Sequence, residues 1–311
     1  MEFQAAYRHL LPRGQLDARA KEARRHLVDC DLCARDCRAD RLKGLAGVVC
    51  HTGENAIVHS YGAHHGEEAP IRGWKGSGTL FFSWCSLRCE YCQNWEIGRH
   101  GTGRELDAAG LADCMLRLQD QGCHNINLVT PSHVVSQIIE AVAIAAYSGL
   151  NLPLVYNTGG YDSLPALRLL DGIVDIYMPD MKYGDATAAR RLSHARDYVD
   201  VNRAAVREMY RQVGDLQIDR DGVARRGLLV RHLVLPGNAS ATGKVLEFVS
   251  RELSPATYVN LMDQYRPCFH ANRYPPLDRR LSQDEFESAT LCARRLGLTR
   301  FDREPMASAP S

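Results

Sequence analysis

From residue 76 onward, short apolar runs alternate with longer stretches of helical periodicity. The apolar runs are too short for helices and rich in β-branched or aromatic residues, so they predict buried strands. These runs are residues 78–82, 126–129, 152–156, 174–178, 228–235 and 258–262. Apolar residues at three- and four-residue spacing predict helices between them, at residues 111–118, 134–146, 201–213 and 245–253. Because parallel strands need crossover connections, this alternation predicts an α/β fold with helices outside a parallel sheet.

The alternation by itself fits either a doubly wound sheet or a partial TIM-like barrel. In both folds the active site lies at the carboxyl ends of the strands. A closing helix is indicated by the capping box of Ser282 and Glu285, with Gly297 as its C-terminal cap. Residues 216–222 resemble a short strand and a tight turn, which indicate either a hairpin flap at the barrel edge or a structural insertion.

The composition of the 311 residues is that of a globular protein with a sizeable core, since 45% are hydrophobic and 24% charged. With 38 basic and 37 acidic side chains, the net charge is +1, so neither a nucleic acid nor a membrane is expected as a partner. The longest apolar run, residues 134–154, is too interrupted by polar residues to span a bilayer. The N-terminus carries no recognisable signal peptide. The odd count of 11 cysteines argues for reduced thiols or metal ligands. We therefore expect a cytoplasmic protein.

Three cysteines follow the first predicted strand within eight residues. Cys85, Cys89 and Cys92 have the spacing Cys-x3-Cys-x2-Cys. Three thiolates on one loop can hold three irons of a [4Fe–4S] cluster and leave the fourth iron open. The alternatives are a zinc site completed by a residue such as His100, or thiols packed in the core.

This spacing, with the aromatic Tyr91 before the last cysteine, resembles the radical S-adenosylmethionine (SAM) superfamily. Within it, the chain is most similar to the pyruvate formate-lyase activating enzyme group. The matching stretches are residues 76–78, 81–83, 92–94, 180–183, 208–210, 231–237 and 262–265, and the resemblance covers residues 25–303. Where the relatives have Gly before the first cysteine and Asn after it, this chain has Trp84 and Ser86.

The resemblance implies a partial (β/α)6 TIM-like barrel and a [4Fe–4S] cluster held by Cys85, Cys89 and Cys92, whose open iron binds SAM. Reductive cleavage of SAM gives a 5′-deoxyadenosyl radical that abstracts a hydrogen atom from a substrate. An activating-enzyme-like function implies a glycine of a partner protein as that substrate, and an electron donor such as flavodoxin or ferredoxin. The alternatives are direct radical modification of a small molecule or peptide, and a non-catalytic iron–sulfur or zinc protein.

The resemblance also indicates which residues contact SAM, and most of them follow the predicted strands. These residues are Tyr91, Asn94, Thr130, Asn157, Thr158, Asp180, Lys182 and Arg231. Asp180 and Lys182 match a pair that reaches the ribose or the carboxylate of SAM in relatives, and a salt bridge is the alternative. Arg231 pairs either with the methionine carboxylate or with Asp180.

A second cysteine group precedes the barrel. Its four members, Cys30, Cys33, Cys37 and Cys50, can complete a closed tetrahedral site for zinc or ligate an iron–sulfur cluster. We therefore divide the chain into residues 1–75 with a metal-binding module, 76–303 with the barrel, and a flexible tail, 304–311. The other four cysteines are expected in structural positions, except that Cys268, with His270, could face the substrate.

Overall fold

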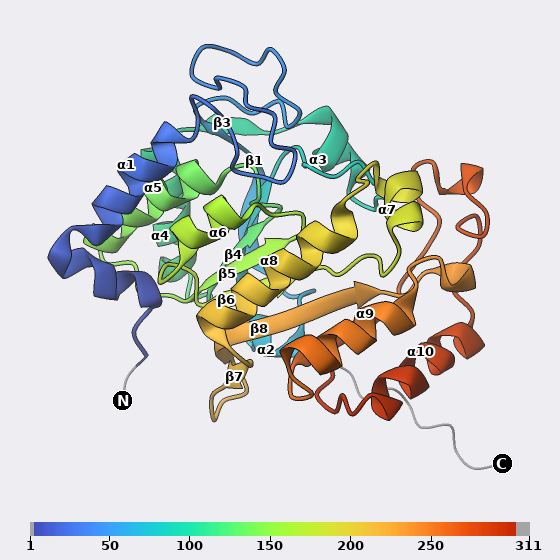
Figure 1. Ribbon diagram of the computed structural model, residues 1–311. Coiled ribbons are helices and arrows are strands. Elements are labelled where there is room, and N and C mark those ends of the chain that lie inside the picture. Colours follow the sequence, from blue (N-terminus) through green and yellow to red (C-terminus); the bar gives the residue numbers. More distant parts are fainter. Residues whose placement is uncertain (1–2, 303–311) are drawn as a thin grey trace.

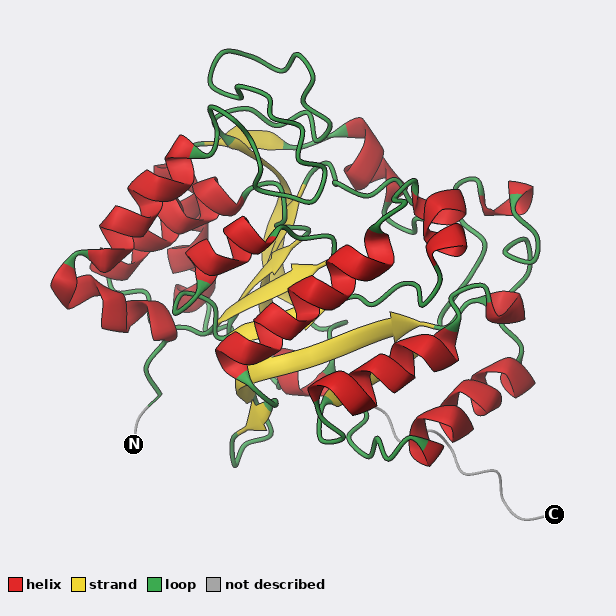
Figure 2. Cartoon of the chain, viewed as in Figure 1, coloured by secondary structure: helices red, strands yellow, loops and turns green. Residues whose placement is uncertain are grey.

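The computed structural model describes residues 3–302, and its centre is a sheet of six parallel strands. They are β2 (Ser77–Phe82), β4 (Ile126–Val129), β5 (Leu154–Thr158), β6 (Ile176–Pro179), β8 (Ala224–Leu233) and β9 (Tyr258–Met262). Each strand pairs in parallel with the next one in this series. All six predicted strands are confirmed, and the curved sheet is a partial TIM-like barrel (Figures 1 and 2).

Helices cover the outer face of the curved sheet, as the alternation of strands and helices predicts. They are α4 (Ala108–Asp120), α5 (Val135–Tyr147), α6 (Leu164–Leu170), α8 (Tyr198–Val213), α9 (Thr242–Phe248) and α10 (Gln283–Arg295). Helix α6 is absent from the sequence prediction, since its seven residues give too short a periodic pattern. The main apolar core lies between these helices and the sheet, and it includes Leu128 of β4, Ile138 of α5 and Tyr156 of β5.

The inner face of the barrel has its own smaller apolar cluster. Because side chains alternate along a strand, Val155 points away from its neighbours Leu154 and Tyr156, which belong to the outer core. Val155 packs instead in a cluster with Ile71 and Tyr258. Ile71 lies on α2 (Ala69–Arg72), whose carbonyl at Ile71 accepts a hydrogen bond from Asn125 Nδ2, at 2.7 Å. Since Asn125 directly precedes β4, α2 lies at the amino ends of the strands.

Two strands that the sequence does not predict extend the sheet. Strand β1 (Ala56–His64) pairs antiparallel with β2, and β3 (Arg104–Leu106) pairs antiparallel with β1. The sheet is therefore continuous across the boundary drawn at residues 75 and 76. The hairpin at residues 216–222 is present, because β7 (Gln217–Ile218) pairs with the start of β8. It lies at the amino end of that strand, opposite the expected active site.

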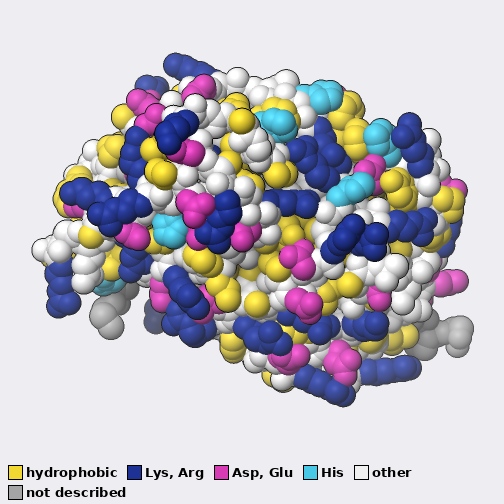
Figure 3. All heavy atoms as spheres, turned by 45° about the horizontal axis from the view of Figure 1, so that its top comes forward, with side chains coloured by type: hydrophobic (Ala, Val, Ile, Leu, Met, Phe, Trp, Pro, Cys, Tyr) yellow, Lys and Arg dark blue, Asp and Glu magenta, His cyan; other side chains and the backbone are white. Residues whose placement is uncertain are grey.

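The remaining elements connect or flank the barrel. They are α1 (Gln15–Arg25), α3 (Trp95–His100), α7 (Ala186–Ser193), 3-10 helices at Ala6–Arg13, Pro236–Asn238 and Ala271–Arg273, and a π-helix at Val249–Leu253 that continues α9. The capping box of Ser282 and Glu285 is confirmed at the start of α10, and Gly297 follows that helix with a φ of +81°. Within residues 3–302, no helix has the length and apolar character needed to cross a membrane. The face with the long loops carries basic and acidic side chains interspersed (Figure 3).

Candidate active site at the carboxyl ends of the strands

The loop of residues 83–94, here called the cysteine loop, joins the carboxyl end of β2 to α3 and carries Cys85, Cys89 and Cys92. All three side chains are partly exposed. Burial raises the pKa of Cys85 to about 11 and that of Cys92 to about 12, and the negative charge of Cys89 adds to both shifts. The three thiols therefore lie close enough together to influence one another. A bound cation would reverse these shifts, because coordinating thiols are deprotonated.

Hydrogen-bond donors point at the sulfurs of the cysteine loop. Ser193 Oγ donates to Cys89 Sγ at 2.9 Å, and the Leu87 N–H donates to Cys85 Sγ at 3.4 Å. Such donors stabilise thiolates and tune an iron–sulfur cluster. Among residues 3–302, no three His, Cys, Asp or Glu side chains are placed as ligands of one metal ion. Cluster ligands each bind a different iron, so the loop fits a cluster through its three thiols and their donors.

A buried network of aromatic and hydroxyl groups supports the cysteine loop. Tyr91 is 5% exposed, and its hydroxyl accepts a hydrogen bond from Tyr183, at 2.8 Å. The Tyr183 hydroxyl also lies 2.6 Å from Ser193 Oγ, which in turn reaches Cys89. The Tyr91 ring packs edge-on against Tyr265. The motif position of Tyr91 is therefore occupied by a side chain that connects the loop to α7 and to the segment after β9.

Glu90 is a second anchor of the cysteine loop, and it is not among the residues predicted from the sequence. Its carboxylate is 2.6 Å from His194 Nε2 and 2.9 Å from His270 Nδ1. His270, considered above as a residue facing the substrate, thus contacts the loop itself. The sequence offers no signal for this contact, since the two histidines lie 104 and 180 residues from Glu90.

Asp180, Lys182 and Arg231 meet at the carboxyl ends of β6 and β8. Lys182 Nζ lies 2.5 Å from one oxygen of Asp180, and Arg231 Nε lies 2.9 Å from the other. Burial alone would raise the pKa of Asp180, but the charges of Arg231 and Lys182 outweigh it and lower the pKa to about 2. The salt-bridge alternative is therefore present in the structure, and it is partly buried, since the three side chains are 13–21% exposed.

The other candidate SAM contacts differ from one another in exposure and in their hydrogen-bond partners. Thr130 has a left-handed backbone with a φ of +62°, and its N–H donates to the carbonyl of Asn157 at 2.9 Å. Asn157 is 4% exposed. The Thr158 hydroxyl donates to Asp162 at 2.7 Å, which directs it toward the following loop. Asn94 is exposed at the end of the cysteine loop, just before α3.

The second cysteine group lies in residues 26–55, here called the four-cysteine segment. Its members are Cys30, Cys33, Cys37 and Cys50. Burial raises the pKa of Cys33, and the negative charges of Cys50, Cys30 and Cys37 contribute to the same shift. The four thiols therefore lie near enough to influence one another, but among residues 3–302 no three of them are placed as ligands of a single metal ion. Arg41, which is 2% exposed, lies beside them with Nη1 3.6 Å from Cys30 Sγ.

The four-cysteine segment packs directly on the cysteine loop. Arg35 Nε donates to the Ser86 carbonyl, and Arg88 Nη2 donates to the Val49 carbonyl, each at 2.7 Å. The rings of His51 and Trp84 lie 4.3 Å apart. Trp84 has a φ of +68°, a left-handed conformation that glycine adopts without strain. This explains why a glycine suits the position, and it shows that the tryptophan of this chain connects the two cysteine groups.

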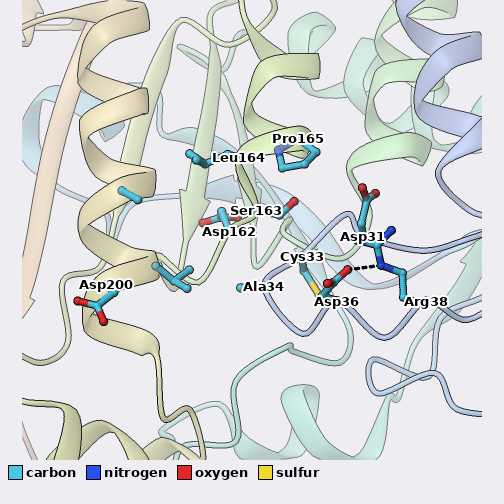
Figure 4. A pocket seen from close by; sticks show the side chains of 12 residues that line it. Asp31, Cys33, Ala34, Asp36, Arg38, Asp162, Ser163, Leu164, Pro165 and Asp200 are labelled. Carbon is cyan, nitrogen blue, oxygen red and sulfur yellow. Dashed lines mark ion pairs between the residues drawn. The ribbon is translucent and has the colours of Figure 1, made fainter.

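A cavity of about 400 Å³ lies beside the four-cysteine segment rather than inside the barrel (Figure 4). Its lining includes Cys33 and Asp162, whose backbones form a β-bridge, and Asp200 of α8. Asp36 and Arg38 form an ion pair of 2.6 Å at its edge. None of the cysteine-loop thiols contributes to its lining.

No protein-family model matches the chain. A protein of Methanocaldococcus jannaschii described as uncharacterized is 28% identical over 291 residues, which cover 91% of this chain and 79% of that protein. This relative carries no functional description that could be compared with the site.

The chain is also similar in fold to solved structures whose function is described. A radical SAM methyltransferase from Sphaerobacter thermophilus matches with a TM-score of 0.50 and 18% identity, covering 72% of this chain and 66% of that one. The chain has the fold of a radical SAM enzyme. The FeFe-hydrogenase maturase HydG from Carboxydothermus hydrogenoformans matches with a TM-score of 0.46 and 15% identity, covering 71% of this chain and 52% of that one. The chain thus spans slightly less than two thirds of the first structure and about half of the second.

Proposed function

We propose that this protein is a radical SAM enzyme in which Cys85, Cys89 and Cys92 hold a [4Fe–4S] cluster with one open iron. The observation that carries the proposal is the position of these thiols. They share one loop at the carboxyl end of β2, which is the first parallel strand of a barrel with the radical SAM fold. The carboxyl ends of barrel strands are where such folds hold their active sites.

The cluster, when bound, would supply the electron that cleaves SAM to a 5′-deoxyadenosyl radical for hydrogen abstraction. The chain's own residues would hold and shield it. Ser193 and the Leu87 N–H donate to two of the sulfurs. Tyr91 and Tyr183 are buried behind the loop and exclude water from that side. Cys89→Ala should therefore remove the catalytic cluster.

SAM would lie over the strand ends next to the cysteine loop. Asp180, Lys182 and Arg231 offer charged groups there for its ribose and its carboxylate. Backbone and side-chain atoms near Thr130, Asn157 and Thr158, together with Tyr91 and Asn94, complete the proposed contacts. These residues follow β2, β4 or β6, or belong to the last part of β5 or β8.

We further propose an activating-enzyme-like reaction, in which the hydrogen atom comes from a glycine of a partner protein. Direct modification of a small molecule or peptide is the alternative. Either reaction needs an electron donor such as flavodoxin or ferredoxin. The four-cysteine segment would hold a second metal, either zinc or an iron–sulfur cluster, against the cysteine loop.

The test is anaerobic reconstitution with iron and sulfide, followed by reduction with dithionite in the presence of SAM. We expect a brown protein that forms 5′-deoxyadenosine and methionine, measured by liquid chromatography. Cys292→Ala on α10 is the matched control for loss of a thiol, because Cys292 lies outside both cysteine groups. It should keep both colour and activity. If zinc fills the sites and no 5′-deoxyadenosine forms, the protein is a metal-binding protein without radical chemistry.

A further inference from the structure

Two adjacent carboxylates, Glu67 and Glu68, enter the barrel from the end opposite the cysteine loop. Their side chains are 8% and 3% exposed. Glu68 directly precedes α2, which lies at the amino ends of the strands, and its Oε1 accepts a hydrogen bond of 2.8 Å from Asn260 Nδ2 of β9. The two carboxylates therefore belong to the floor of the barrel and the proposed cluster to its mouth, and Arg231 lies between them, next to Asp180 on one side and the carboxylates on the other.

Of these two carboxylates, Glu68 has no cationic partner at hydrogen-bond distance. Arg231 Nη1 lies 3.9 Å from an oxygen of Glu67 and 3.9 Å from one of Glu68, too far for a hydrogen bond. The same guanidinium is bonded to Asp180 through Nε, and Asp180 also holds Lys182. Arg231 and Lys182 are both engaged by Asp180, and His64 Nδ1 lies 3.4 Å from Oε1 of Glu67, so Glu68 has no cation within hydrogen-bond distance. Burial and the neighbouring charge of Glu68 raise the pKa of Glu67.

Two residues at the barrel interior carry buried polar atoms without hydrogen-bond partners. Among the described residues, these atoms are Glu68 Oε2 and both amide atoms of Asn127. Asn127 is fully buried, and it points into the barrel because its neighbours Ile126 and Leu128 belong to the outer core. Its register partner on β5 is Val155, which packs with Ile71 of α2. Such unpaired buried groups are costly, so each one calls for an explanation.

We propose that Glu67, Glu68 and Asn127 form a recognition site for a substrate with a cationic nitrogen group, either a protonated amine or a guanidinium. The N–H donors of that group would bond to Glu68 Oε2 and Asn127 Oδ1, and its charge would balance that of Glu68. The rest of the substrate would extend toward the cysteine loop. The assignment of this molecule as the substrate rests on the proposed radical SAM function. The binding site itself is argued only from the contacts of Glu67, Glu68 and Asn127 and does not depend on that function.

The experiment measures binding of small cations to the reconstituted protein by titration calorimetry, with SAM present at saturation. The probes are N-acetyl-arginine amide and N-acetyl-lysine amide, and N-acetyl-norleucine amide is the uncharged comparison. We expect at least one cationic probe to bind at least about tenfold more tightly than the norleucine probe. Because SAM is already bound, this result cannot come from a cation binding in the place of SAM.

Glu68→Gln tests the role of the charge, because the glutamine oxygen can still accept the hydrogen bond from Asn260. It should weaken binding of the cationic probe at least about tenfold. Glu105→Gln is the matched control, since Glu105 of β3 also accepts from an asparagine amide, Asn55 Nδ2, but is exposed. Its affinity for the probe should not change. Equal binding by the Glu68 variant, or equal binding of the norleucine probe, would overturn the proposal, as would failure of both cations to bind.

Asn127→Leu gives a readout that does not depend on the charge. The leucine has a similar size and removes two unpaired buried atoms, so the melting temperature of the unliganded protein should rise while the cationic probe binds more weakly. A lower melting temperature with unchanged binding would indicate a purely structural residue and would contradict the proposal.

Formation of 5′-deoxyadenosine, measured on the same samples, separates this proposal from the proposed function. Cleavage of SAM without binding of the cationic probe refutes the cation site alone. Binding that depends on Glu68 without cleavage of SAM refutes the radical SAM function and leaves the cation site in place.

Discussion

The two cysteine groups of this protein differ in their scaffolds and in their exposure. Cys85, Cys89 and Cys92 follow a strand of the barrel and are all partly exposed. In the four-cysteine segment, residues 26–55 form no helix or strand, and Cys30, Cys33 and Cys50 are only 4–7% exposed. Closed sites suit structural metals, whereas catalytic sites keep a position open. The difference in exposure matches the two roles that we propose.

The two groups are nevertheless neighbours. Arg35, Arg88 and the contact between the rings of His51 and Trp84 join them across 33 to 51 residues of sequence. A change in the four-cysteine segment can therefore reach the cysteine loop through a small number of named contacts. The comparison yields three predictions.

The largest effect should come from a pair of cysteine substitutions. Cys89→Ala should abolish SAM cleavage, because it removes a ligand of the proposed catalytic cluster. Cys33→Ala should keep cleavage and lower the melting temperature, because a closed metal site stabilises the fold around it. Iron content, 5′-deoxyadenosine formation and thermal melting distinguish the two. Equal colour and activity in the Cys89 variant would contradict the assignment of the loop.

A fall in pH should lower the stability of the barrel because of one buried histidine. His232 of β8 is fully buried between the Met181 carbonyl and Thr242 Oγ1, and burial lowers its pKa from 6.5 to about 4. Between pH 6.5 and 4 the unfolded chain binds this proton and the folded chain does not. Stability should therefore fall as the pH drops through that window, by up to roughly 3 kcal/mol.

Urea unfolding at several pH values measures this loss. His232→Gln removes the titrating group, so its free energy of unfolding should change less between pH 6.5 and 4 than that of the wild type. Identical slopes for the two proteins would show that the acid sensitivity arises elsewhere.

The smallest effect should come from the contact between the two regions. Arg88→Met keeps the aliphatic stem and removes the hydrogen bond to the Val49 carbonyl, so we expect a loss of about 1–2 kcal/mol in the free energy of unfolding. Cleavage of SAM should decrease only partly. Arg117→Met is the control, since Arg117 is an exposed arginine on α4 paired with Asp113. If Arg88→Met lowers the free energy of unfolding no more than Arg117→Met does, the four-cysteine segment and the cysteine loop are energetically independent.

The strands and helices of the barrel could be predicted because their signals are local. Strands β4 and β9 match the predicted ranges, and β5 and β6 begin and end one to two residues later than predicted. Strand β1 was missed because most of its side chains are partly or fully exposed, so it carries no apolar alternation. It becomes a strand only through pairing with β2 and β3.

The residues of the candidate site also fall into those that the local sequence predicts and those that only the fold brings together. The spacing of Cys85, Cys89 and Cys92 lies within eight residues, so the sequence alone determined that these thiols share a loop. Only the tertiary structure decided that Glu90 meets two histidines, or that Glu68 meets Asn260 at a distance of 192 residues along the chain. Such pairs depend on how the barrel closes, since curvature and register bring together residues whose own neighbourhoods carry no sign of each other. The thiols were therefore readable in the sequence, whereas the barrel floor that we propose for the substrate was not.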